Sequence, residues 1–94
     1  MGSNKSRYDD RLQTIQGLER EVITLQHLLS NHSRRLGLSD VLNIAKAHNG
    51  ITLMISSVES WIYTDRRANW ITQQEAEELT GLLEEVKSTL NMLM

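Results

Sequence analysis

The sequence predicts an all-α fold, an antiparallel bundle of three long helices of the coiled-coil type. The first observation is an apolar stripe whose members recur, from Ile15 onward, at alternating steps of three and four residues, the spacing of a helix that packs along its whole length. Its members are Tyr8, Ile15, Leu18, Val22, Leu25, Leu29, His32 and Leu36. The second observation is the absence of proline from the 94 residues, which suits long helices. We expect helices over 6–36, 40–67 and 73–93 in a single domain, after a flexible N-terminus over 1–5.

The first helix is expected to begin at Ser6 and to end at Gly37. Ser6 is followed three residues later by Asp9, a variant of the capping box in which side chains bind backbone N–H groups at a helix start. Gly37 would supply the left-handed residue that ends many helices. Arg34 and Arg35 would lie in the last turn, where cations complement the helix dipole.

The second helix has Ser39 as its candidate N-cap and Asp40 in its first turn. Two interpretations compete for its middle. Asn49-Gly50 either breaks it in two, because this pair readily adopts positive φ, or is carried inside one helix that reaches Arg67. The phase of the apolar face continues across the pair and favours one helix, since an interior glycine costs only about 1 kcal/mol. The expected face consists of Val41, Ala45, His48, Thr52, Ile55, Val58 and Ile62.

The third helix carries the clearest start signal in the chain. Thr72 and Glu75 have the spacing of a capping box, and Ile71 and Ala76 occupy the two positions of a hydrophobic staple around it. The coiled-coil spacing then continues to the end of the chain through Ala76, Leu79, Leu83, Val86, Leu90 and Leu93. Helices joined by short connections pack antiparallel to their sequence neighbours.

Composition limits the class of protein. There is no cysteine, so neither a disulfide nor a thiolate metal site can form. A net charge of −2 argues against a large phosphate-binding surface. No apolar run approaches the ~20 residues that span a bilayer, and the polar N-terminus has no secretory signal. We therefore expect a cytoplasmic protein.

Neither a metal site nor a catalytic site is expected. His27 and His32 are five residues apart and point in different directions, so they cannot share a metal as an i, i+4 pair would. The glutamates of 73–93 lack the Glu-x-x-His partner of a di-metal bundle. The chain has no glycine-rich phosphate loop and no nucleophile paired with a base. We expect a protein that is not an enzyme and needs no cofactor.

The segment 41–60 can also be laid on a helix-turn-helix frame with Asn49 at the turn, which makes a small DNA-binding regulator the second alternative. A recognition helix needs polar or basic side chains that reach base edges. The would-be recognition helix after the turn offers Ile51, Leu53 and Met54 instead, and it has no Lys or Arg before Arg66. The charge of the chain and this segment both disfavour nucleic acid as a partner.

The first six residues, Met1-Gly-Ser-Asn-Lys-Ser6, match the signal for N-myristoylation, which would place an acyl chain on Gly2. This hexapeptide resembles the lipidated N-terminus of Src-family kinases, and the resemblance covers only these six residues. It implies a membrane-surface or matrix-like adaptor, although one chain binds membranes only marginally. The alternative origin of Met-Gly-Ser is a cloning remnant. The charged residues expected at this end are Lys5, Arg7, Arg11, Arg66 and Arg67, offset by Asp9, Asp10 and Asp65.

Aromatic and arginine side chains gather around the second connection: Trp61, Tyr63, Arg66, Arg67 and Trp70. Such residues dominate the energy of protein–protein binding. They form either an exposed partner-binding patch, or a core in which the tryptophans are buried and the arginines are ordinary helix-end charges.

The leading interpretation is a non-enzymatic helical protein that binds another protein, as an adaptor, regulator or inhibitor, and forms a homo-oligomer. The chain has more apolar helix length than a bundle of its size needs, since the first helix is longer than the third. The expected oligomer interface is the stripe of the first helix, namely Ile15, Leu18, Val22, Leu25, Leu29 and His32.

Overall fold

The computed structural model describes residues 3–31 and 37–93, and it places nearly all of them in three helices. Helix α1 is Ser3–Asn31, α2 is Leu38–Arg67 and α3 is Gln73–Leu93. Each helix packs against the other two. The expected all-α three-helix bundle is confirmed.

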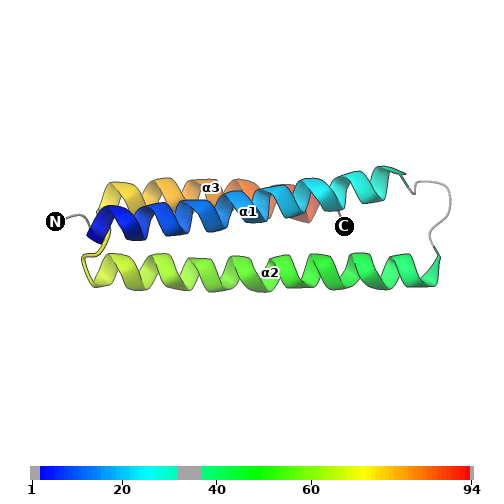
Figure 1. The fold of residues 1–94 in the computed structure, drawn as a ribbon, viewed down its shortest axis with the longest axis horizontal. Helices are drawn as coiled ribbons and strands as arrows, with labels where there is room; N and C mark the ends of the chain where they lie inside the picture. The colour runs from blue at the N-terminus through cyan, green and yellow to red at the C-terminus, as the bar shows by residue number, and fades with distance from the viewer. Residues whose placement is uncertain (1–2, 32–36, 94) are drawn as a thin grey trace.

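The bundle is a rod of 53 × 19 × 16 Å in which α2 runs antiparallel to both α1 and α3 (Figure 1). Helix α3 has 21 residues, against 29 in α1 and 30 in α2. It therefore stops short, and at one end of the rod α1 and α2 continue without it (Figure 1). The other end holds the start of α1 and the α2–α3 connection.

The core is built from aliphatic side chains of all three helices. The stripe of α1 is buried at Ile15, Leu18, Val22 and Leu25, and Tyr8 and Leu29 pack against it while half-buried. His32 and Leu36, which belong to the same predicted stripe, lie outside the described residues. The expected face of α3 is buried from Ala76 to Leu90, with Leu93 at its edge.

Helix α2 turns a different face inward from the one expected in its first half. Ile44 and Ile51 are buried, whereas Val41, Ala45 and Thr52 of the predicted face are exposed. The predicted face is the buried one from Ile55 onward, and in the first half only His48 of that face is half-buried. The physical reason is the apolar area that is buried. Isoleucine removes more apolar surface from water than alanine or threonine does. The helix is therefore rotated about its axis so that Ile44 and Ile51 face the core.

Asn49-Gly50 lies inside α2, which is continuous through this pair. The predicted start is wrong, because Gly37 rather than Ser39 caps the helix. Gly37 is extended, with φ −71° and ψ 163°, so it is not the left-handed end of α1. Its carbonyl accepts a bond from the N–H of Val41 at 3.1 Å, and its own N–H donates to the carboxylate of Asp40 at 3.3 Å.

The predicted start of α1 is also wrong. The helix begins at Ser3, so Ser6 lies inside it and does not cap it. Arg7 and Tyr8 explain the difference, because each is held by a partner on another helix, Asp65 on α2 and Glu78 on α3. Tertiary contacts thus stabilise the first turns of α1.

The α2–α3 connection is a Schellman turn followed by a capping box. Asn69 has φ 61°, and bonds run from its N–H to the carbonyl of Arg66 and from the N–H of Trp70 to that of Asp65, which is the Schellman pattern. At the start of α3, Glu75 N–H donates to the Thr72 hydroxyl at 3.0 Å and Thr72 N–H donates to the Glu75 carboxylate at 2.9 Å. The predicted capping box is confirmed, and Ile71 and Ala76 of its staple are buried.

Replacing the cap should weaken α3. Thr72→Ala should lower the free energy of unfolding by about 1 kcal/mol, because the N–H of Glu75 loses its acceptor, and Thr72→Asp should be nearly neutral. Urea unfolding followed by circular dichroism measures both. Thr80→Ala, an exposed site within the same helix, is the matched control and should not destabilise the chain. Equal effects of the two alanine variants would contradict the assignment of the cap.

Candidate protein-binding site

A buried carboxylate organises the end of the bundle where α1 begins and α2 ends. Asp65 is 1% exposed and is bound by two arginines of α1. Arg11 forms a fork with it, Nε at 2.8 Å from Oδ2 and Nη2 at 3.4 Å from Oδ1. Arg7, one turn earlier, donates to Oδ1 at 3.3 Å. The carboxylate is therefore fully paired, and the two guanidinium groups are fixed in place.

Each of these arginines also lies against a tryptophan. The guanidinium carbon of Arg7 is 4.0 Å from the ring centre of Trp70, and that of Arg11 is 5.0 Å from the ring centre of Trp61. Both distances are those of cation–π contacts. Trp61 is 37% exposed and Trp70 is 41% exposed. Both tryptophans are therefore partly exposed, and the interpretation in which both are buried in the core is wrong.

Local structure explains how the five side chains meet. On α2, Trp61 and Asp65 are one turn apart and so lie on the same face of the helix. Arg7 and Arg11 have the same spacing on α1. Because the two helices are antiparallel neighbours, these two pairs of side chains lie opposite each other. The Schellman turn reverses the chain so that Trp70 returns over Arg7, its N–H bonded to the carbonyl of Asp65 at 2.9 Å. We call Arg7, Arg11, Trp61, Asp65 and Trp70 the arginine–tryptophan cluster.

The five residues predicted to bind a partner belong to different sets of contacts in the structure. Trp61 and Trp70 join the arginine–tryptophan cluster. Tyr63 and Arg67 form a separate exposed pair, with Arg67 Nη1 donating to the Tyr63 hydroxyl at 3.1 Å. Arg66 donates to the side chain of Gln73 at the start of α3. The five predicted residues therefore do not form one cluster but have three separate sets of partners.

Sequence reasoning noticed Asp65, Arg7 and Arg11 as charges but did not join them into a site. A signal was present. Asp65 follows Ile55, Val58 and Ile62 at core spacing, and Arg11 precedes Ile15 and Leu18 in the same way. Opposite charges at the ends of two antiparallel core stripes predict an internal ion pair.

Tyr8 ties the same end of α1 to α3. Its hydroxyl donates to the carboxylate of Glu78 at 2.6 Å. This hydrogen bond is the main cause that raises the pKa of Tyr8 above its usual 10.0, and partial burial and the charges of Glu78, Glu75 and Asp9 add to the effect. Because the folded-state pKa is raised, the bond stabilises the fold below pH 10 and is lost at higher pH.

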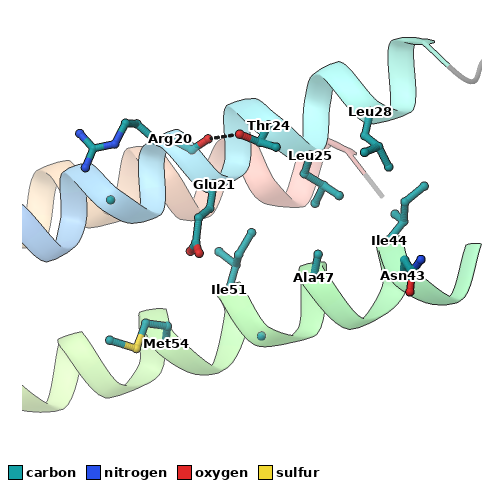
Figure 2. A pocket seen from close by; sticks show the side chains of 12 residues that line it. Arg20, Glu21, Thr24, Leu25, Leu28, Asn43, Ile44, Ala47, Ile51 and Met54 are labelled. Atoms are coloured by element: carbon teal, nitrogen blue, oxygen red, sulfur yellow. Dashed lines mark hydrogen bonds between the residues drawn. The ribbon is translucent and has the colours of Figure 1, made fainter. Parts of the chain in front are cut away.

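A second feature is an open groove of about 760 Å³ between α1 and α2. Figure 2 shows its apolar floor, where Leu25 and Leu28 of α1 face Ile44 and Ile51 of α2, near the end that α3 does not reach. Gly17 and Gly50 also line it, and a methyl group added at either one would meet no atom within 4 Å. The groove is open because small residues leave it unfilled.

Most of the residues predicted to form an oligomer interface lie inside the core of the chain itself. Ile15, Leu18, Val22 and Leu25 are at most 4% exposed inside the chain's own core, so a second copy could reach them only if the bundle opened. Leu29 is half-buried against that core. Of the other predicted sites, His32 and Gly2 lie outside the described residues.

The structure also bears on a helix-turn-helix, a metal site and a membrane-spanning helix. Segment 41–60 is one unbroken stretch of α2, so it does not contain the turn of a helix-turn-helix. Within 3–31 and 37–93, no three His, Asp or Glu side chains are grouped to hold a metal. Across the same residues, no helix is apolar over a length that would cross a bilayer.

Comparisons of the chain with protein-family models, with curated proteins and with solved structures find no match.

Removing the charge of Asp65 should destabilise the bundle strongly. Asp65→Asn keeps the shape but leaves Arg11, only 17% exposed, without its counter-charge, and breaking such pairs costs about 3 kcal/mol. Chemical denaturation measures the loss. Asp9→Asn, an exposed aspartate on the same end, should change stability by less than about 0.5 kcal/mol. A small effect of Asp65→Asn would mean that water solvates both guanidinium groups in place of the carboxylate, which would contradict the prediction.

The raised pKa of Tyr8 can be read from phenolate absorbance. Part of the tyrosine signal should appear only above pH 10, because the hydrogen bond to Glu78 holds the phenol proton. Tyr8→Phe should lack this part, and Glu78→Gln should move it toward pH 10. If Glu78→Gln leaves the titration unchanged, the bond is not formed in solution.

Proposed function

We propose that this chain is a non-enzymatic binding protein that recognises another protein through the arginine–tryptophan cluster. The observation that carries the proposal is the pair of half-exposed tryptophans, each held against an arginine of α1. Tryptophan and arginine are the residue types most enriched among the side chains that dominate binding energy.

Pre-organisation supports the proposal. Binding loses free energy when flexible side chains become ordered. Here Arg7 and Arg11 are already fixed by Asp65, and the two rings are fixed by the arginines. A partner would therefore meet a rigid aromatic surface with guanidinium N–H groups at its edge. Acceptors such as carboxylates or backbone carbonyls on the partner would complete their hydrogen bonds.

A membrane-surface adaptor is the second candidate, and one observation favours it. Helix α1 begins at the same end of the rod as the cluster (Figure 1), so an acyl chain on Gly2 would bring tryptophan and arginine side chains to the lipid headgroups, where both are favoured. An acyl group on Gly2 is the chemical feature that separates this candidate from the first.

Affinity capture from a lysate of the organism that encodes the chain tests the proposal. The double variant Trp61→Ala/Trp70→Ala should lose a partner that the native chain retains, since each such truncation commonly costs about 2 kcal/mol of binding free energy or more. Tryptophan fluorescence of the native chain should shift to the blue when the purified partner is added, because the rings leave water.

Two controls locate the site. Tyr63→Ala/Arg67→Ala removes the neighbouring pair, and Met92→Ala removes an apolar side chain 79% exposed on α3; both should retain the partner. Circular dichroism shows that each variant is folded. A partner that binds the tryptophan variant as well as the native chain would refute the proposed site.

A further inference from the structure

The two arginines of the arginine–tryptophan cluster bind Asp65 in different ways. Arg11 places one edge of its guanidinium group on the carboxylate, with Nε at 2.8 Å and Nη2 at 3.4 Å. Such a two-point contact is the geometry that guanidinium groups favour with carboxylates. Arg7 donates to Asp65 through Nη1 alone, at 3.3 Å. Its Nε and Nη2, the edge that Arg11 uses, have no hydrogen-bond partner among the described residues.

This free edge of Arg7 is accessible from outside the bundle. The side chain of Arg7 is 41% exposed, against 17% for Arg11. Neither free nitrogen is buried, because the one buried side-chain nitrogen or oxygen without a partner in the described part of the chain is Nε2 of His48. Trp70 lies on the face of the Arg7 guanidinium group, and a planar group stacked in this way keeps its edge for hydrogen bonds. A second acceptor can therefore bind Arg7 without displacing Asp65 or Trp70.

The charges of the cluster do not balance. Asp65 carries one negative charge and is bound by two guanidinium groups. Within residues 3–31 and 37–93, Arg7 forms no ion pair except the one with Asp65, and Asp10, one turn along α1, does not pair with it. The carboxylate of Glu78 is bound by the hydroxyl of Tyr8. The cluster thus has one positive charge in excess, on the more exposed of its two arginines.

We propose that the partner of the arginine–tryptophan cluster is an acidic peptide segment that places the carboxylate of an aspartate or glutamate on Nε and Nη2 of Arg7. This inference rests on the proposed function and names the chemistry of the partner at the same site. The carboxylate accepts two hydrogen bonds from Arg7, as Asp65 does from Arg11. Apolar side chains beside it in the segment cover the exposed parts of Trp61 and Trp70, which are residues of the type that dominates binding energy.

The number of charges favours a carboxylate over other acceptors. A carboxylate balances the single excess charge, whereas a backbone carbonyl has no charge to offer. A phosphate group carries about −1.5 to −2 at neutral pH and would need a second cation. Arg11 already uses its edge on Asp65, and Arg66 and Arg67 are each bonded to another side chain.

Selection from a phage-displayed library of random peptides, with the native chain as bait, tests the inference. The selected peptides should be enriched in aspartate or glutamate next to apolar residues. The same selection with Trp61→Ala/Trp70→Ala as bait should not yield them. One selected acidic peptide, made by synthesis, then serves as the probe for affinity measurements.

A double-mutant cycle locates the carboxylate of this probe. At about 0.15 M salt, Arg7→Gln should weaken binding about tenfold, and so should changing the acid of the peptide to its amide. Both changes together should cost no more than either alone, because they remove the same contact. Arg7→Lys keeps the charge but loses the two-point geometry, so its affinity should lie in between. Calorimetric titration measures each affinity, and circular dichroism shows that each variant is folded.

Arg67→Gln is the matched control. Arg67 is an arginine at the same end of the bundle, but it is bonded to Tyr63 and lies outside the cluster. Its replacement should change the affinity by less than about twofold, since exposed charges that do not touch the ligand contribute little.

The outcomes separate the inference from the proposed function. Additive losses in the cycle, or selected peptides that need the tryptophans but carry no acidic residue, would overturn the inference and leave the proposed function standing. Acidic peptides that need Arg7 but bind Trp61→Ala/Trp70→Ala as well as the native chain would contradict the proposed function alone. A selection that yields no peptide dependent on the cluster would overturn both. Displacement of the probe by phosphatidylserine vesicles, but not by phosphatidylcholine vesicles, would assign Arg7 to lipid headgroups and overturn the inference.

Discussion

The buried carboxylate of Asp65 is the contact on which the arrangement of this bundle depends most. Its side chain binds Arg7 and Arg11 and so fixes how far α1 slides along α2. Its backbone carbonyl accepts from Trp70 and so closes the turn that leads into α3. Burying an ion pair adds little net stability, because desolvation offsets the attraction. An ion pair at one place along two helices instead favours the alignment in which its partners meet.

The two ends of the rod differ because the three helices differ in length. At the end that α3 reaches, polar and aromatic side chains close the bundle around Asp65. Towards the other end, which α3 does not reach, an open groove with an apolar floor lies between α1 and α2 (Figure 2). The proposed binding surface, the arginine–tryptophan cluster, lies at the first of these two ends.

Sequence determined the class of fold and much of its detail, because those features follow from local rules. The spacing of α3, the capping box at Thr72 and the continuity of α2 through Gly50 each depend on a few neighbouring residues. The tertiary structure decided what local rules cannot. It extended α1 back past Ser6, since partners on other helices hold Arg7 and Tyr8. It rotated the first half of α2 to bury Ile44 and Ile51 in place of Ala45 and Thr52, and it gave the α1 stripe to the chain's own core. Above all it brought Asp65 between two arginines 54 and 58 residues away in sequence, because only the packing of whole helices sets which distant side chains meet.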